Sequence, residues 1–313
     1  MVITLCYLTS RRDCKLEWWL DSLRLQIKPE DEIHIVIVDF WAKHRATLPG
    51  INPAPAAVDD DIVTYVKSLR HVEPKPNVWQ GQHRLTKEDW FAAANARNTA
   101  LCLCRTDWLA YCDDLSVLAP TWLEAVRRAV AGNYVALGAY KKVRNLVVEK
   151  GIIKSFEEFP GGLDSRLRHP GEVVSCGGDW MYGCSVAAPV EAFLCVNGWP
   201  EAFDGLSFED VCMGIAIGNT NKFSFRYDKS MLTLESEEHH YIEKPMKRSD
   251  FGVSPKDKSH AALNIAKSSR WFPNYFGDEG IRGLRQRVLN GDPFPTLQCP
   301  QHCWFTGRPI AEL

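Results

Sequence analysis

Two apolar runs near the N-terminus constrain the fold more than any other feature of the sequence. Residues 2–8 and 33–38 are almost continuously apolar, and Asp39 follows the second run. Such runs are typical of parallel strands that are covered on both faces. The segment between them, residues 16–26, has the apolar spacing of a helix. Strand, helix and strand predict a right-handed βαβ unit, and hence an α/β fold with a mostly parallel central sheet flanked by helices.

A third apolar run ends in two adjacent acids. Residues 108–111 predict a buried strand, and Asp113 and Asp114 follow it. Open α/β sheets bind their ligands at the carboxyl ends of strands, and two adjacent carboxylates favour a cation between them. The alternative is a solvated turn that leads into a helix with Thr121 as its N-cap. This segment alone supports the two interpretations equally.

Later segments continue the alternation of helices and strands. A helix is predicted from residue 87 through 101, a strand over 134–140, and a helix from Glu209 through Ile217. Residues 141–173 are polar and have no clear period, which predicts an irregular functional loop. Shorter elements are predicted over residues 190–195, 223–227, 231–234 and 281–289.

Composition excludes several classes of protein. The formal net charge of -2 over 313 residues gives no global positive field for non-specific nucleic-acid binding. The cysteine count of 11 is odd and several cysteines lie in apolar runs, which indicates reduced thiols rather than disulfides. Cys299 and Cys303 flank His302 without a second ligand pair, so tail packing is favoured over structural zinc. No stretch is long and apolar enough to span a bilayer, and we expect a cytoplasmic protein.

Several motifs, in their order along the chain, carry a resemblance to a known family. They are Thr9-Ser-Arg11, Asp39, Ala96-Arg-Asn-Thr-Ala100, Asp113-Asp114, Gly198-Trp-Pro-Glu-Ala-Phe203 and Glu209-Asp210. Together they resemble a GT-A fold nucleotide-sugar glycosyltransferase of the family 2-like group, over about residues 2–240. The resemblance implies a Rossmann-like GT-A domain over residues 1–245, with a nucleotide-binding half (1–120) and an acceptor and catalytic half (121–245). Residues 246–313 are expected to be a C-terminal extension that packs on the same domain.

The resemblance also implies a donor, a nucleoside diphosphate sugar and most simply a UDP-sugar, from which a hexosyl or N-acetylhexosaminyl group is transferred. Asp39 would contact the base or ribose, although a turn-capping role is the alternative. Arg97 would reach the nucleotide, and an internal salt bridge with the acidic strand end is compatible with that role. The residues implied to bind the nucleotide sugar are Thr9, Arg11, Asp39, Arg97, Asn98 and Asp113.

A divalent cation, Mn²⁺ or Mg²⁺, is the implied cofactor, and two registers are open for its ligand. In one register Asp114 binds the ion and Asp113 faces the ribose. In the other, Leu115 stands where a ligand should be, and metal binding would be weak or absent. The first register is preferred because it aligns Leu115–Pro120 without a gap. The further ligands expected are His239 and His240, with His260 as the alternative.

The resemblance assigns the chemistry to Glu209-Asp210. Asp210 would take the proton of the acceptor hydroxyl, with inversion at the anomeric carbon, and Glu209 would orient sugar hydroxyls. A simple helix cap is the alternative. Trp180, with Gly178 and Asp179 beside it, is expected to contact acceptor or sugar, and core packing is the alternative for the Trp180 ring.

The acceptor is open between a glycan, a lipid-linked glycan and a nucleic acid. A phage-type DNA-modifying enzyme that acts on a hydroxylated base would use a local basic surface. A non-catalytic relative that binds nucleotide sugars is a further alternative, and a nucleotidyltransferase is disfavoured because Thr9-Ser-Arg-Arg12 contains no glycine. The basic residues considered for DNA binding are Lys141, Lys142, Arg144, Arg166, Arg168, Arg282, Arg285 and Arg287.

Overall fold

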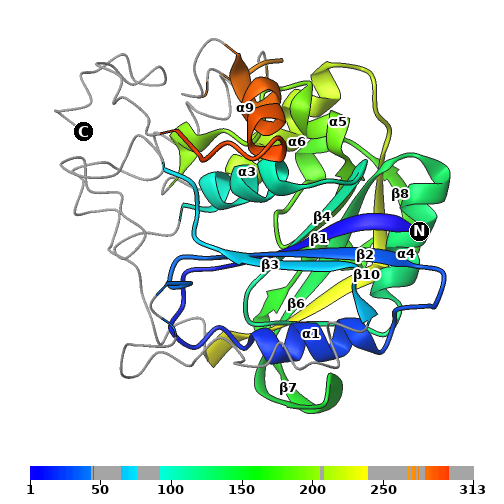
Figure 1. Ribbon diagram of the computed structural model, residues 1–313. Coiled ribbons are helices and arrows are strands. Elements are labelled where there is room, and N and C mark those ends of the chain that lie inside the picture. Colours follow the sequence, from blue (N-terminus) through cyan, green and yellow to red (C-terminus); the bar gives the residue numbers. More distant parts are fainter. Residues whose placement is uncertain are drawn as a thin grey trace, which may run out of the picture.

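A computed structural model describes residues 1–43, 45, 65–76, 92–204, 208–238, 267, 270–272, 274 and 279–295. Its described strands form one ten-stranded sheet with helices on both faces (Figure 1). The strand order is β3-β2-β1-β4-β9-β6-β10-β5, with β7 paired to β6 and β8 to β10. This confirms the predicted α/β class with a central sheet flanked by helices.

The first four strands of this order are parallel, as the βαβ pattern predicts. In register, Thr9 lies beside Asp39, and Leu8 lies beside Asp113, so the polar ends of three strands meet at one edge. The carboxyl ends of these strands therefore bring together residues that lie far apart in the sequence. The four strands are β1 (Val2–Thr9), β2 (Glu32–Asp39), β3 (Ser68–Val72) and β4 (Trp108–Asp113).

The second half of the sheet is mixed. Strand β9 runs antiparallel to both β4 and β6, and so joins the parallel half to a second parallel pair, β6 and β10. Strands β5 and β8 pair with β10, and β7 pairs with β6. The remaining strands are β5 (Ser116–Leu118), β6 (Val135–Glu149), β7 (Ile152–Leu163), β8 (Val173–Cys176), β9 (Ser185–Pro189) and β10 (Phe225–Ser236).

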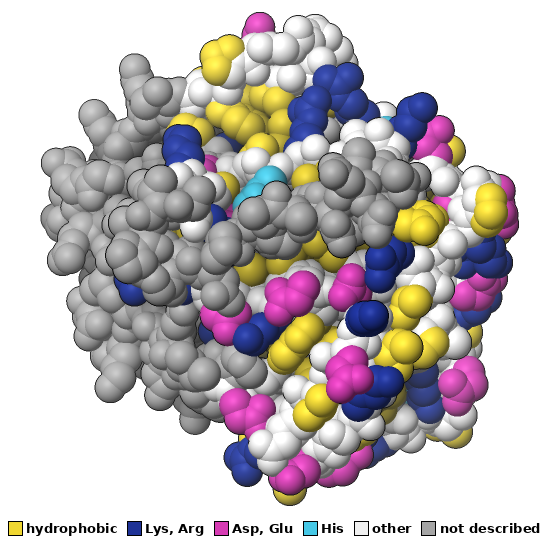
Figure 2. Space-filling model, turned by 60° about the horizontal axis from the view of Figure 1, so that its bottom comes forward, with side chains coloured by type: hydrophobic (Ala, Val, Ile, Leu, Met, Phe, Trp, Pro, Cys, Tyr) yellow, Lys and Arg dark blue, Asp and Glu magenta, His cyan; other side chains and the backbone are white. Residues whose placement is uncertain are grey.

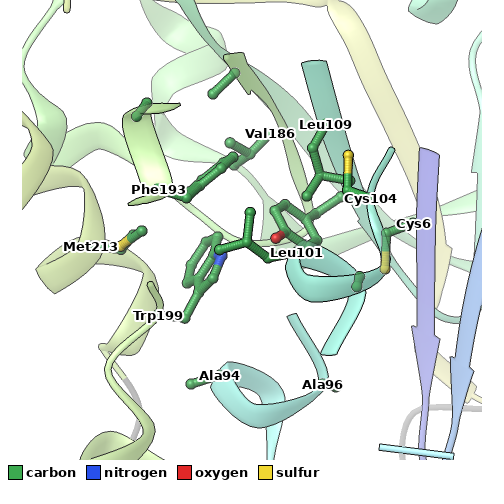
Figure 3. Packing of buried hydrophobic residues seen from close by; sticks show 14 of the residues in the cluster. Cys6, Ala94, Ala96, Leu101, Cys104, Leu109, Val186, Phe193, Trp199 and Met213 are labelled. Carbon is green, nitrogen blue, oxygen red and sulfur yellow. The ribbon is translucent and has the colours of Figure 1, made fainter. Parts of the chain in front are cut away.

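The helices divide between the two faces of the sheet, and each face has its own apolar core. On one face α3 packs with α5, α6 and α9, and Figure 3 shows Trp199 and Phe193 beside Leu101 in this core. On the other face α1 and α4 place Trp19 and Trp122 against strand residues such as Ile35. Their bounds are α1 (Leu16–Arg24), α3 (Ala93–Leu103), α4 (Trp122–Gly132), α5 (Val190–Leu194), α6 (Glu209–Asn219) and α9 (Gly280–Leu289).

The prediction of an irregular loop over residues 141–173 is wrong for most of that segment. Strands β6 and β7 form a long antiparallel hairpin there, and β7 is mostly exposed. Three shifts in register within the hairpin, and the Pro160-Gly161-Gly162 stretch, hide the alternating period that would have indicated strands. The tail of the segment contains the 3-10 helix η2 (Ser165–Arg168) and the start of β8.

Two smaller expectations also change, and one is confirmed. The two strands predicted over 223–234 are one strand, β10, whose register with β6 shifts between Asp228 and Leu232. Thr121 precedes α4, but its hydroxyl donates to the Ser230 carbonyl and does not cap the helix. The nine described cysteines are free thiols, as the odd count indicated. Among the described helices, none has both the length and the apolar character needed to cross a membrane.

The helix of the C-terminal segment lies on the α3 face of the sheet. Ile281, Leu284 and Val288 of α9 join the core that contains α3. The side-chain oxygen of Asn197 accepts a hydrogen bond from the Ile281 N–H (2.8 Å), and Arg285 donates to the Cys104 carbonyl (2.8 Å). These contacts fit the expected packing of the extension on the same domain, although the domain boundaries stay a prediction.

Candidate active site

The carboxyl ends of β1 and β4 meet at Asp114, the second acid of the Asp113-Asp114 pair. The Thr9 hydroxyl donates to Asp114 Oδ2 (2.7 Å), and Arg11 Nε donates to Asp114 Oδ1 (3.1 Å). Thr9 is the last residue of β1, and Arg11 lies in the turn that follows it. The structure thus brings together Thr9, Arg11 and Asp114, three residues that the sequence assigned to the nucleotide and metal end of the site.

The turn after the two acids has an unusual backbone. Leu115 has φ 59° and is 2% exposed, although the left-handed region is rare for a large side chain. Its N–H donates to the Tyr7 hydroxyl (3.2 Å), which itself donates to the Cys14 carbonyl. Because this turn buries Leu115 and leaves Asp114 beside Thr9 and Arg11, the geometry favours the register in which Asp114, and not position 115, faces the site.

Arg97 of α3 joins the two acidic motifs. Its guanidinium donates to Asp113 (3.0 Å) and to Glu209 (3.0 Å), and it lies over the Trp199 ring, 4.7 Å from its centroid. Burial alone would lower the pKa of Arg97, but the charges of Asp113 and Glu209 outweigh burial and raise it. The internal salt bridge anticipated for Arg97 is therefore present.

A glycine makes room for this guanidinium. A Cβ atom on Gly183 would lie 2.1 Å from Arg97 Nη2. The Gly183 N–H also donates to Asp210 Oδ2 (3.0 Å). Gly183 therefore connects Arg97 to the second acid of the Glu209-Asp210 motif, a role that no motif in the sequence indicated.

Helix α6 begins at the second acidic motif. Phe208, the residue before it, has φ 69° and is 39% exposed, while Glu209 and Asp210 occupy the first turn. The two oxygens of Asp210 accept from the N–H groups of Gly183 and Val211 (2.7 Å for Val211). Burial raises the pKa of Asp210, and the positive charge of Arg97 opposes this rise. A carboxylate with a raised pKa is suited to take a proton near neutral pH.

Glu235 of β10 is an acidic residue of the site that sequence reasoning missed as a candidate. Its Oε1 is buried and has no hydrogen-bond partner among the described residues. Burial raises the pKa of Glu235 to about 8, and the charge of Asp113 adds to this effect. In register, Glu235 lies opposite Ser116 of β5, which follows the Asp113-Asp114 turn directly. Its place among other polar residues after a strand was visible in the sequence, but its burial was not.

The chemistry of these residues fits a divalent cation. Carboxylate oxygens are the ligands that Mg²⁺ and Mn²⁺ prefer. Asp114 offers them in the turn between β4 and β5, and Glu235 offers them on β10, which pairs with β5. Among the described residues, no three acidic, histidine or cysteine side chains gather closely enough to form a ready-made metal site. The predicted ligands His239 and His240, and the alternative His260, lie outside the described residues.

Asp39 lies at the carboxyl end of β2 and is 1% exposed. Its carboxylate accepts hydrogen bonds from the Trp41 N–H (2.9 Å), from the guanidinium of Arg45 and from His71 Nε2 (2.8 Å). Burial would raise the pKa of Asp39, but the hydrogen bonds from His71 and Arg45 lower it overall. The turn-capping alternative is thus present in the structure, and the contact of Asp39 with a base stays a prediction.

Asn98 holds α3 against the loop before α6. It is fully buried, and its side-chain amide donates to the Trp199 carbonyl (2.8 Å) and accepts from the Trp199 N–H (2.8 Å). Asp204 accepts from the N–H groups of Ala94 (2.7 Å) and Asn95 (3.1 Å), and so caps α3 from a distant loop. These contacts fix the helix that carries Arg97. The predicted contact of Asn98 with the nucleotide stays untested.

The three residues expected on the acceptor side, Gly178, Asp179 and Trp180, differ in burial and in contacts. Trp180 is half-buried, and its ring packs edge-on against Tyr227, with centroids 5.7 Å apart. Gly178 packs against α6, where a Cβ on Gly178 would lie 1.9 Å from the Gly214 carbonyl oxygen. Asp179 is exposed. Core packing therefore accounts for Gly178 and for part of the Trp180 ring, and acceptor contacts remain predictions for all three residues.

No family model matches the sequence, and no curated protein matches it significantly. Solved structures do match. The chain is similar to Staphylococcus aureus TarS (residues 1-349, in complex with UDP-GlcNAc), with a TM-score of 0.51 and 13% identity over 85% of this chain. It is also similar to GalNAc-T7 with UDP, GalNAc and Mn²⁺, with a TM-score of 0.50 and 12% identity over 85% of this chain.

This chain has a GT-A-like fold of the nucleotide-sugar glycosyltransferases. The GT-A-like sheet explains why the acidic motifs after β4 and at the start of α6 face one region. The chain spans 66% of the TarS structure and 48% of the GalNAc-T7 structure. At these identities the likeness establishes the fold alone.

Proposed function

We propose that the protein is a glycosyltransferase that uses a UDP-sugar donor and inverts the anomeric carbon. The observation that carries this proposal is the Arg97 bridge. One side chain contacts Asp113 at the end of β4 and Glu209 at the start of α6, at 3.0 Å each. The bridge holds the two acidic motifs on either side of a single region, which is the arrangement that glycosyl transfer needs.

The donor diphosphate lies, in this proposal, at the carboxyl ends of β1 and β4. Arg11 and Thr9 already contact Asp114 there, and the Arg11 guanidinium is suited to phosphate oxygens. Asp113 contacts the ribose. Asp114 and Glu235, together with a histidine such as His239 or His240, would hold Mn²⁺ or Mg²⁺, which when bound neutralises the charge on the diphosphate.

The acceptor hydroxyl approaches from the side of α6. Asp210 takes its proton, and the oxygen attacks the anomeric carbon opposite the departing diphosphate, so the configuration inverts. Backbone N–H groups of Gly183 and Val211 fix the carboxylate of Asp210. Glu209, held by Arg97, orients sugar hydroxyls, and Trp180 and Asp179 lie on the acceptor side. The transferred group is a hexosyl or N-acetylhexosaminyl unit in this proposal.

Three of the basic residues considered for the DNA-modifying alternative have partners within the protein. Arg166 is buried, donates to Asp164 and packs 4.0 Å from the Tyr182 ring centroid, so it is not a surface cation. Lys141 pairs with Glu158, and Arg282 pairs with Glu191 (2.7 Å). Figure 2 shows acidic and basic side chains interspersed on the face it presents. We therefore favour a glycan or lipid-linked acceptor.

Donor hydrolysis tests the proposal, because water can replace an unknown acceptor. Release of UDP is measured from UDP-GlcNAc, UDP-GalNAc and UDP-glucose with Mn²⁺, with Mg²⁺ and with EDTA. We expect hydrolysis of at least one donor that depends on the metal and falls at least about 100-fold in Asp114→Ala. Mn²⁺ binding, measured by electron paramagnetic resonance, is expected to weaken in Asp114→Ala and Glu235→Gln. Equal rates under all conditions would overturn the metal-dependent mechanism.

A further inference from the structure

We propose that His71, and not Asp39, reads the nucleobase of the donor, and that it selects a uracil-type base. This inference rests on the proposed function and deepens it. It concerns a histidine on the edge strand β3 that no motif in the sequence singled out.

Asp39 has no capacity left for a ligand. An ionised carboxylate offers about four lone-pair sites. Oδ1 accepts from the Trp41 N–H (2.9 Å) and from Arg45 Nη2 (3.0 Å), and Oδ2 accepts from Arg45 Nε and from His71 Nε2 (2.8 Å). The side chain is also 1% exposed. A base that approached Asp39 would have to break one of these buried bonds, which is costly.

His71 is the partner of Asp39 that reaches the surface, with 20% of its side chain exposed. Asp39 only accepts hydrogen bonds, so the hydrogen in this contact must lie on Nε2 of His71. In the neutral imidazole Nδ1 then keeps its lone pair and is an acceptor. Among the described residues no hydrogen bond engages Nδ1. Asp39 therefore fixes the tautomer of the neutral imidazole, and in this form the acceptor that a ligand can reach belongs to His71.

The position of His71 agrees with a base-reading role. It lies near the carboxyl end of β3, beside Ile37 of β2. Arg45, the second side chain that contacts Asp39, donates to the carbonyls of Arg11 (2.9 Å) and Arg12 (2.7 Å). Arg11 in turn contacts Asp114. A continuous set of contacts thus runs along the strand ends, from His71 at the sheet edge to the proposed diphosphate position.

The acceptor at Nδ1 discriminates between bases by hydrogen bonding. Uracil presents a ring N3–H donor between two carbonyl groups, and this donor matches the Nδ1 lone pair. Cytosine presents a bare N3 lone pair at the same place, so two acceptors would face each other. A single lost hydrogen bond is worth about a factor of ten in affinity. We therefore expect UDP to bind about tenfold more tightly than CDP.

Calorimetric titration with UDP, CDP, ADP and GDP tests the inference. The variants are His71→Ala and His71→Gln, because a glutamine amide still donates to Asp39 but has no acceptor at the Nδ1 position. His34→Ala is the matched control. His34 lies near the amino end of β2, where it contacts Ser68 and Glu32. Urea unfolding of each variant records any loss of stability.

We expect both His71 variants to lose about tenfold in UDP affinity and to bind UDP and CDP almost equally, while His34→Ala keeps the tenfold preference. His71→Gln should retain nearly the stability of the wild type. An unchanged preference for UDP in His71→Gln would overturn the inference and leave the proposed function intact. Tightest binding of CDP, ADP or GDP by the wild type would overturn the inference together with the UDP-sugar donor of the proposed function. Failure of the wild type to bind any of the four nucleotides would overturn both.

Discussion

Single buried charges hold this site together. Arg97 and Asp39 are both nearly inaccessible, yet each has partners on several different elements. A buried charge is stable only when it is paired, so the removal of one partner costs far more than the removal of a surface ion pair. These residues therefore set the positions of neighbouring side chains that ligands can reach.

At the residue scale, Asp39 makes the stability of the protein sensitive to acid. Its pKa in the folded protein is lowered, so protonation favours the unfolded chain. The stabilisation by Asp39 is present above the usual aspartate pKa of about 4 and is lost as the pH falls below it. Urea unfolding at pH 7 should show Asp39→Asn to be about 3 kcal/mol less stable than the wild type.

The same difference should shrink steadily when unfolding is measured between pH 5 and pH 3. Glu32→Gln is a suitable control, because Glu32 is an exposed acid at the other end of the same strand. A difference between wild type and Asp39→Asn that does not change over this range would contradict the assigned role of Asp39.

Two residues with a left-handed backbone differ in exposure, and glycine substitutions at them can be compared. Phe208 (φ 69°) is 39% exposed, whereas Leu115 (φ 59°) is 2% exposed. Glycine adopts this backbone without the cost of about 1–2 kcal/mol that other residues incur. Phe208→Gly should therefore raise the free energy of unfolding by about 1 kcal/mol. Leu115→Gly should lower it by about 2 kcal/mol, because the loss of a buried leucine outweighs the relief.

Chemical denaturation of both variants under the same conditions checks this prediction. Loss of stability in Phe208→Gly would contradict the prediction, because the contacts of the exposed ring would then stabilise the fold by more than the left-handed backbone of Phe208 destabilises it.

At the scale of elements, the contact between η3 (Gly178–Trp180) and α6 fixes the helix that carries Glu209 and Asp210. A Cβ on Gly214 would lie 1.9 Å from the Gly178 carbonyl oxygen, which is a backbone atom and cannot turn aside as the end of a flexible side chain can. Gly214→Ala should therefore destabilise the protein by about 2–3 kcal/mol and lower donor hydrolysis, since α6 must shift.

Gly218→Ala, one turn further along α6, is the control. Its Cβ would lie 3.9 Å from the Phe225 ring, an ordinary contact, and alanine favours a helix over glycine by about 1 kcal/mol. Thermal unfolding and UDP release from both variants test the pair. Equal stability of the two variants would contradict the close approach of η3 and α6.

Some strands of the sheet could be predicted from the sequence, and others could not. Long apolar runs such as those of β1 and β2 predicted the parallel half of the sheet, because burial on both faces leaves a strong signal. Short strands such as β5 and β9 were missed, since a few residues carry no measurable period. The β6–β7 hairpin was missed because its strands are polar and irregular in register.

Part of the candidate site could also be predicted from the sequence. Motifs that end a strand or begin a helix, such as Asp113-Asp114 and Glu209-Asp210, could be placed because their elements were recognised. Glu235 and His71 could not. Their importance depends on burial and on partners from distant strands, and a residue type alone does not show either.

At the scale of the whole molecule, the GT-A-like sheet brings two acidic motifs from separate parts of the chain to one region, and Arg97 joins them. The central claim is that the motif on α6 performs the chemistry while the strand ends of the other half bind the nucleotide. This division predicts that binding and turnover can be separated by a single substitution.

Asp210→Asn tests this claim most directly, with UDP binding measured by calorimetry and turnover measured as UDP release from the best donor. We expect UDP affinity within about twofold of the wild type and turnover lower by about 10²–10⁴-fold, the usual contribution of a general base. Asp107→Asn, an exposed acid just before β4, should change neither quantity. Turnover by Asp210→Asn at the rate of the wild type would contradict the role of Asp210 as the general base.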